Sequence, residues 1–102
     1  MGDSILTKVK RSLLIPESET FADGEIEILI ASCKELISST GVSREVIDDS
    51  QMALTLIFIY TKSFFGSKTD GSVRELPGSF YTILNQLAIS KGWVAWLTLE
   101  LV

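Results

Sequence analysis

The segment from Gln51 to Phe65 constrains the fold most, because it is apolar on nearly every side of a helix. Its apolar members are Met52, Ala53, Leu54, Leu56, Ile57, Phe58, Ile59, Tyr60, Phe64 and Phe65. A helix of this kind is usually surrounded by other elements. Its most apolar run ends at Thr61 and Lys62, well short of the roughly 20 residues that cross a bilayer. The segment therefore predicts a central helix in a helical domain.

Two further helices are predicted before this segment. The first runs from Ser4 to Leu14, with Asp3 or Ser4 as its cap and Pro16 as its terminator. The second runs from Asp23 to Thr40, because its apolar residues recur at helical spacing and Gly41 follows as a left-handed terminator. The stripe of this second helix comprises Ile26, Leu29, Ile30, Cys33, Leu36 and Ile37.

Shorter connections separate the predicted helices. The polar link Glu17–Asp23 holds Phe21 as a candidate for burial. The link Val42–Ser50 has room for a short helical turn at Arg44–Ile47, and Asp48, Asp49 or Ser50 can cap the central helix. After that helix, Gly66–Leu76 is a long loop by composition.

The last predicted helix runs from Ser79 to Ile89, and Pro77 stands close to its start, where proline is favoured. Its stripe consists of Phe80, Ile83, Leu84 and Leu87. The predicted fold is therefore all-α: a small four-helix domain over residues 1–92 with a long loop before the last helix.

The segment Trp93–Val102 has a different character and alternates in the manner of a β-strand. It is predicted to be an extended, apolar C-terminal tail. One interpretation is that this tail folds back as a plug of its own core. The other is that it docks on a second chain, since an apolar strand with open edges can extend a neighbouring sheet.

The residues that enzymes and metal sites use most are scarce. The chain has no histidine, and its single cysteine, Cys33, lies on the apolar stripe of the second helix as a small core residue. The pair Asp48–Asp49 suits a helix cap, and the acidic residues between Glu17 and Glu27 lack the spacing of a calcium loop. We therefore expect no catalytic, cofactor or metal site. With no signal-like leader, the protein is expected in a reducing cytoplasm or in a particle assembled there.

The cations Lys8, Lys10 and Arg11 form the only local basic cluster. Three cations on one short helix are usually a solvated face. The alternative is a small DNA-binding or DNA-packaging regulator that uses this helix. The net charge of −4 over 102 residues disfavours a protein that coats duplex DNA.

The order of these elements resembles the phage head–tail connector family, also called head-completion adaptors. The run from Ser4 to Ile15 is similar to a short first helix that ends in "L-x-I". Asp23–Ile30, followed by Thr40-Gly41, resembles "D-x-x-I-x-x-L-I" followed by "T-G". The later pieces, Leu76-Pro77 and Leu84-Asn85-Gln86-Leu87, resemble the family's closing "L-P" and "Q-L" motifs.

The sequence also departs from the family pattern in two places. Tyr60 is not followed by the expected acid and arginine, and Ala88-Ile89 stand where an arginine is expected. These departures concern contacts between subunits and leave the fold unaffected.

The resemblance implies a structural subunit that performs no bond chemistry and needs no cofactor. Such adaptors form a ring, typically dodecameric, beneath the portal protein. The ring extends the channel through which DNA passes without specific binding, and it offers a surface to a stopper or tail-completion protein. The location implied is the head–tail interface of the virion, after synthesis in the bacterial host's cytoplasm and without a membrane partner. The candidate interface residues are Lys68, Asp70, Arg74 and Glu75 in the loop and Trp93, Val94, Trp96, Leu97, Leu99 and Leu101 in the tail.

Overall fold

A computed structural model describes residues 4–66 and 75–91 of the chain. These residues form the helices α1 (Ile5–Ser12), α2 (Asp23–Ser38), α3 (Arg44–Asp49), α4 (Gln51–Phe64) and α5 (Gly78–Lys91), with no strand among them. The all-α prediction is confirmed. The count of four helices is one too low, because the expected turn after Arg44 is a separate helix, α3.

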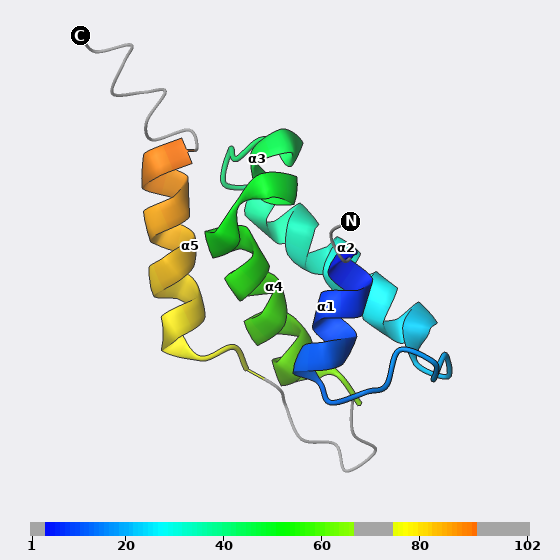
Figure 1. The fold of residues 1–102 in the computed structure, drawn as a ribbon. Coiled ribbons are helices and arrows are strands. Elements are labelled where there is room, and N and C mark those ends of the chain that lie inside the picture. The colour runs from blue at the N-terminus through cyan, green and yellow to red at the C-terminus, as the bar shows by residue number, and fades with distance from the viewer. Residues whose placement is uncertain (1–3, 67–74, 92–102) are drawn as a thin grey trace, which may run out of the picture.

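Helix α4 lies at the centre of the fold, with α5 along one side and α1 and α2 along the other (Figure 1). It packs against all four other helices, most extensively against α2 and α5. This arrangement confirms the prediction from its all-round apolar sequence, because each face of α4 meets a different neighbour. The predicted length is also close, since α4 ends at Phe64.

Serine side chains cap the N-termini of three helices, α1, α3 and α4. The hydroxyl oxygens of Ser4, Ser43 and Ser50 accept hydrogen bonds from the backbone N–H groups of Thr7, Val46 and Ala53, at 3.1, 3.3 and 3.3 Å. Each bond satisfies one of the N–H groups that a helix leaves unpaired at its start. The cap predicted for α4 from Asp48, Asp49 or Ser50 is therefore Ser50.

Helix α1 ends two residues earlier than predicted, and Pro16 is not the direct cause. Leu14 has a positive φ of 63°. The backbone N–H of Ile15 donates to the carbonyl oxygen of Lys10 at 2.8 Å, and the N–H of Leu14 donates to the carbonyl oxygen of Arg11 at 3.1 Å. These two bonds make a Schellman motif, in which the left-handed residue is usually glycine. Gly41, with a φ of 97°, follows α2 in the predicted manner.

The core surrounds α4 and takes most of its side chains from α2, α4 and α5. Its largest fully buried side chains from these helices are Ile26, Ile37, Leu56, Ile57, Phe80 and Leu87. Burial also raises the pKa of the Cys33 thiol from its ordinary value of 9.0 to about 12, since the thiolate would lose its hydration there. The stripes predicted for α2 and α5 therefore face the core, with Leu29, Leu36 and Ile83 only half-buried at its edges.

One prediction for the core is wrong. Phe21, expected to be buried, is 77% exposed in the link between α1 and α2. Its neighbour Ala22 belongs to the buried core instead, at the position that immediately precedes α2. The tail of residues 93–102 lies outside the described residues, so the predicted strand is not tested.

Candidate docking surfaces

Only one of the predicted interface residues lies in the described part of the chain. Glu75 is exposed just before Pro77 and the start of α5. The other loop and tail candidates fall in 67–74 and 92–102, outside the described ranges: Lys68, Asp70, Arg74, Trp93, Val94, Trp96, Leu97, Leu99 and Leu101. Their role as contacts therefore stays a prediction.

The expectation that Lys8, Lys10 and Arg11 form one solvated face is wrong for Lys10. This lysine is 3% exposed, and its ammonium donates hydrogen bonds to the backbone carbonyls of Glu17, at 3.0 Å, and Glu19. It also lies 2.9 Å from the carboxylate oxygen Oδ1 of Asp23. That oxygen is shielded from solvent and has no hydrogen bond of good angular geometry, so the ammonium is what compensates its charge. Lys10 thus ties α1, the link and the start of α2 together.

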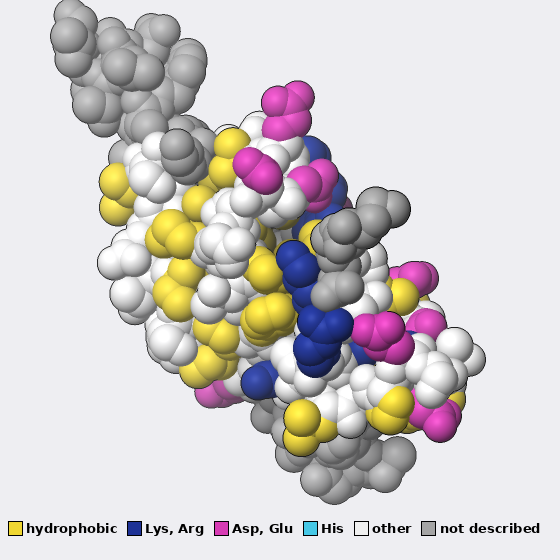
Figure 2. Space-filling view, viewed as in Figure 1, with side chains coloured by type: hydrophobic (Ala, Val, Ile, Leu, Met, Phe, Trp, Pro, Cys, Tyr) yellow, Lys and Arg dark blue, Asp and Glu magenta, His cyan; other side chains and the backbone are white. Residues whose placement is uncertain are grey.

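The rest of the basic cluster is also partly engaged within the fold. The guanidinium of Arg11 pairs with the carboxylate of Glu17 at 3.0 Å, and both side chains are exposed. Figure 2 shows the cationic side chains along α1, between an apolar area over α4 and α5 and acidic groups over α3 and the α1–α2 link. With Lys10 buried, α1 does not present three cations together to a phosphate backbone.

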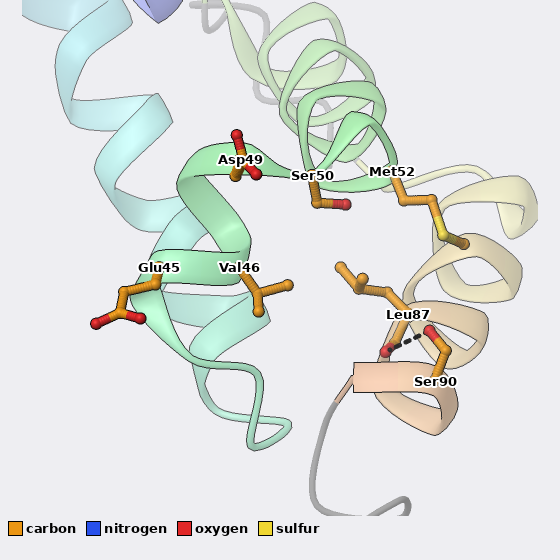
Figure 3. Close-up of a pocket in the computed structure, with 7 residues that line it drawn as sticks. All are labelled: Glu45, Val46, Asp49, Ser50, Met52, Leu87 and Ser90. Atoms are coloured by element: carbon orange, nitrogen blue, oxygen red, sulfur yellow. Dashed lines mark hydrogen bonds between the residues drawn. The ribbon is translucent and has the colours of Figure 1, made fainter.

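A first apolar depression, the α3–α5 cleft, lies between α3, the start of α4 and the end of α5. It encloses about 410 Å³ and is lined by Glu45, Val46, Asp49, Ser50, Met52, Leu87 and Ser90. Val46 and Leu87 point towards each other across the opening, with the Ser50 and Ser90 hydroxyls at its edge (Figure 3). The cleft therefore combines an apolar floor with a polar rim.

A second depression, the α2–α4 groove, has a volume of about 610 Å³ and is lined by Glu25, Ile28, Leu29, Tyr60 and Phe64. Ile28 is 67% exposed on its wall. The aromatic rings of Tyr60 and Phe64 pack in a tilted arrangement, with a centroid distance of 4.8 Å and an interplanar angle of 57°, and form an aromatic side of the groove. Burial raises the pKa of Tyr60, with Cys33 adding to the rise and a hydrogen bond with Ser32 opposing it.

Exposed apolar residues also gather in the link after α1. Leu14 is 90% exposed and stands in the left-handed conformation, and Phe21 is 77% exposed. A large apolar side chain at such a position gains nothing from burial and bears a conformational cost. Residues that break a local rule in this way are often kept for contacts with another molecule.

The sequence analysis missed these surfaces, although one signal was available. Ile28 stands off the apolar stripe of α2, and an apolar residue outside the buried face indicates a second contact. The α3–α5 cleft gives no such signal, because it depends on how α3 and the end of α5 are placed beside the start of α4.

The described ranges contain no group of three or more acidic or cysteine side chains placed to hold a metal ion. Within the same ranges, none of the helices is both long and apolar enough to span a membrane. The described ranges do show apolar depressions and exposed apolar residues on their surface.

Comparison with known proteins identifies a family for this chain. A family model described as phage connector protein matches residues 5–92, which contain all five helices. Neither the curated proteins nor the solved structures contain a significant match to the chain. The family match covers most of the 102 residues. The chain belongs to the phage connector protein family.

Proposed function

We propose that this protein is a head–tail connector subunit that completes the phage head. In this role, copies of the chain form a ring beneath the portal protein, extend the DNA channel and offer a surface to a stopper or tail-completion protein. The action is mechanical and requires no bond chemistry. The place of action is the head–tail interface of the virion.

The observation that carries this proposal is apolar surface left open on more than one side of a single small domain. The α2–α4 groove lies between α2 and α4, and the α3–α5 cleft lies between α3, the start of α4 and the end of α5. A ring subunit needs contact surfaces for two neighbours and for the proteins above and below it. Exposed apolar residues such as Ile28 are what such contacts bury.

We assign residues 1–92 to the connector domain and residues 93–102 to a docking strand. In this proposal the tail pairs with another protein of the assembly, and the loop candidates Lys68, Asp70, Arg74 and Glu75 contribute polar contacts at its rim. An alternating apolar strand gains its affinity from main-chain hydrogen bonds and its specificity from alternate side chains.

Sedimentation velocity of the full chain, alone and mixed with its portal protein, tests the proposal. We expect the chain to co-sediment with the portal as a ring. Ile28→Glu places a charge in the α2–α4 groove and should weaken the assembly by about tenfold or more, since an unpaired charge at an apolar contact costs several kcal/mol.

The matched control is Glu27→Gln, which changes the neighbouring exposed residue without adding a charge. A chain that ends at Gly92 separates the contribution of the tail from that of the groove. The proposal is wrong if the intact chain never co-sediments with the portal and neither Ile28→Glu nor the truncation changes any assembly.

A further inference from the structure

The α3–α5 cleft suits one particular kind of side chain. Its apolar floor is made by Val46, Met52 and Leu87, of which Val46 and Met52 are half-buried and therefore open to a further contact. Its volume of about 410 Å³ lies in the range of small-ligand sites. An aromatic ring resting on this floor would also meet the sulfur of Met52, a favourable contact.

The edge of the cleft offers hydrogen-bond acceptors. The Ser50 hydroxyl accepts one bond from the N–H of Ala53, and the Ser90 hydroxyl donates one to the carbonyl of Leu87 at 3.2 Å. Each hydroxyl oxygen keeps a lone pair for a further donor. Asp49 also belongs to the lining of the cleft, and Glu45 points away from the opening (Figure 3). An apolar floor with acceptors at its edge matches an indole, which has a large apolar body and one N–H donor.

The chain itself carries an indole close to this cleft. Ser90 lines the cleft, and Trp93 follows it three residues later in the sequence. Three residues span at most about 11 Å, so Trp93 starts within reach of the opening. Gly92 stands between the end of α5 and Trp93, and glycine adopts turn conformations that other residues disfavour.

We propose that in the free subunit the indole of Trp93 docks in the α3–α5 cleft of its own chain. The short tether favours the same chain over a neighbour, because it holds Trp93 at an effective concentration in the millimolar range. Trp96 is tethered by three more residues and is the weaker competitor. The tail is then stored against the subunit by one side chain and is released when another protein binds the tail more tightly. This proposal concerns the isolated subunit and does not depend on the ring.

Fluorescence tests the proposal directly, because Trp93 and Trp96 are the only tryptophans in the chain. In the reporter variant Trp96→Phe, all tryptophan emission comes from Trp93. We expect blue-shifted emission and weak quenching by acrylamide. Adding Val46→Glu should shift the emission to the red and raise the quenching constant by about twofold or more, since more than half of the population would leave the cleft.

Two further variants keep the test decisive. Ile28→Glu places the same charge in the α2–α4 groove and should leave the Trp93 emission unchanged. Met52→Gln alters the cleft floor more mildly, so it replaces Val46→Glu if circular dichroism shows that the latter is unfolded. The reciprocal reporter, Trp93→Phe, should show Trp96 more accessible to acrylamide than Trp93.

Three outcomes would overturn the proposal. The first is strong quenching of Trp93 in the reporter variant with an intact cleft. The second is protection of Trp93 that survives both cleft variants, because the indole would then dock elsewhere. The third is protection that disappears over about a hundredfold dilution, which would assign the cleft to the tail of a neighbouring copy rather than to the tethered one.

Discussion

Lys10 shows how one residue fixes the geometry of a connection. Its ammonium donates hydrogen bonds to two backbone carbonyls of the link and forms an ion pair with Asp23 at the start of α2. A buried ammonium is tolerated when hydrogen bonds and an opposite charge replace its hydration, and removal of one partner leaves the other charge unpaired. The buried side chain of Lys10 therefore fixes the path of the link between α1 and α2.

Replacement of Lys10 by methionine should destabilise the fold by about 2 to 3 kcal/mol, which is less than for a fully buried pair because the Asp23 side chain is 28% exposed. Urea unfolding followed by circular dichroism measures this loss. Lys8→Met is the matched control on the same helix and should cost less than about 0.5 kcal/mol. If the two variants are equally stable, the ion contact with Asp23 contributes nothing. A double-mutant cycle with Asp23→Asn separates the ion contact from the two carbonyl contacts.

Cys33 should be inert in the folded protein. Its pKa is raised from 9.0 to about 12 by burial, so the thiol stays protonated at pH values where an exposed cysteine has begun to ionise. A thiol-reactive dye at mildly alkaline pH is expected to label the chain only after urea is added. Rapid labelling without urea would contradict the burial.

The same shift affects stability at high pH. The folded-state pKa lies above the unfolded value, so the unfolded state loses its proton first as pH rises. The contribution of Cys33 to stability is therefore complete below about pH 9 and is lost progressively between pH 9 and about 12. In Cys33→Ala, the fall in stability across this pH range should be smaller than in the parent chain.

At the scale of elements, helical periodicity and capping chemistry predicted most of the fold. Ser50 and Gly41 act at the boundaries of α4 and α2 as expected, because both signals are local in the chain. The length of α3 was underestimated, since a six-residue helix has too few positions for a periodic pattern. The burial of Lys10 and the exposure of Phe21 could not be predicted, because both depend on how the link crosses the ends of α1 and α2.

The end of α1 offers a test of strain. Leu14 adopts a φ of 63° and is 90% exposed, so Leu14→Gly removes a steric cost without removing a core contact. We expect this variant to be more stable by about 1 kcal/mol, as seen by a higher urea midpoint. Leu14→Ala is the control that removes the side chain but keeps the steric cost. A less stable glycine variant would mean that Leu14 makes a contact that stabilises the fold.

At the scale of the whole molecule, charge argues against a DNA-binding role. The net charge is −4, Lys10 is buried and Arg11 pairs with Glu17. We expect no mobility shift of duplex DNA by the isolated subunit, even at low salt, where phosphate contacts are strongest. A salt-sensitive shift that Lys8→Gln abolishes would instead support the DNA-binding alternative.

The candidate site was predicted less completely than the fold. The tail and loop residues proposed as contacts lie outside the described ranges, while the apolar depressions of the described part arise from tertiary packing. Only Ile28, off the stripe of α2, carried a signal in the sequence. Surfaces made by side chains from several helices cannot be read from the periodicity of any one helix.

The attachment of α5 has a consequence for how the subunit unfolds. Its principal contacts are with α4, whereas α4 is also held by α1, α2 and α3. An element held by a single neighbour opens at a lower free energy than the elements it leaves behind. Amide hydrogens of α5 should therefore exchange with solvent before those of α2 and α4, as a cooperative unit. The described part of the molecule then divides into two units. Helices α1 to α4 open slowly, and α5 separates from them first.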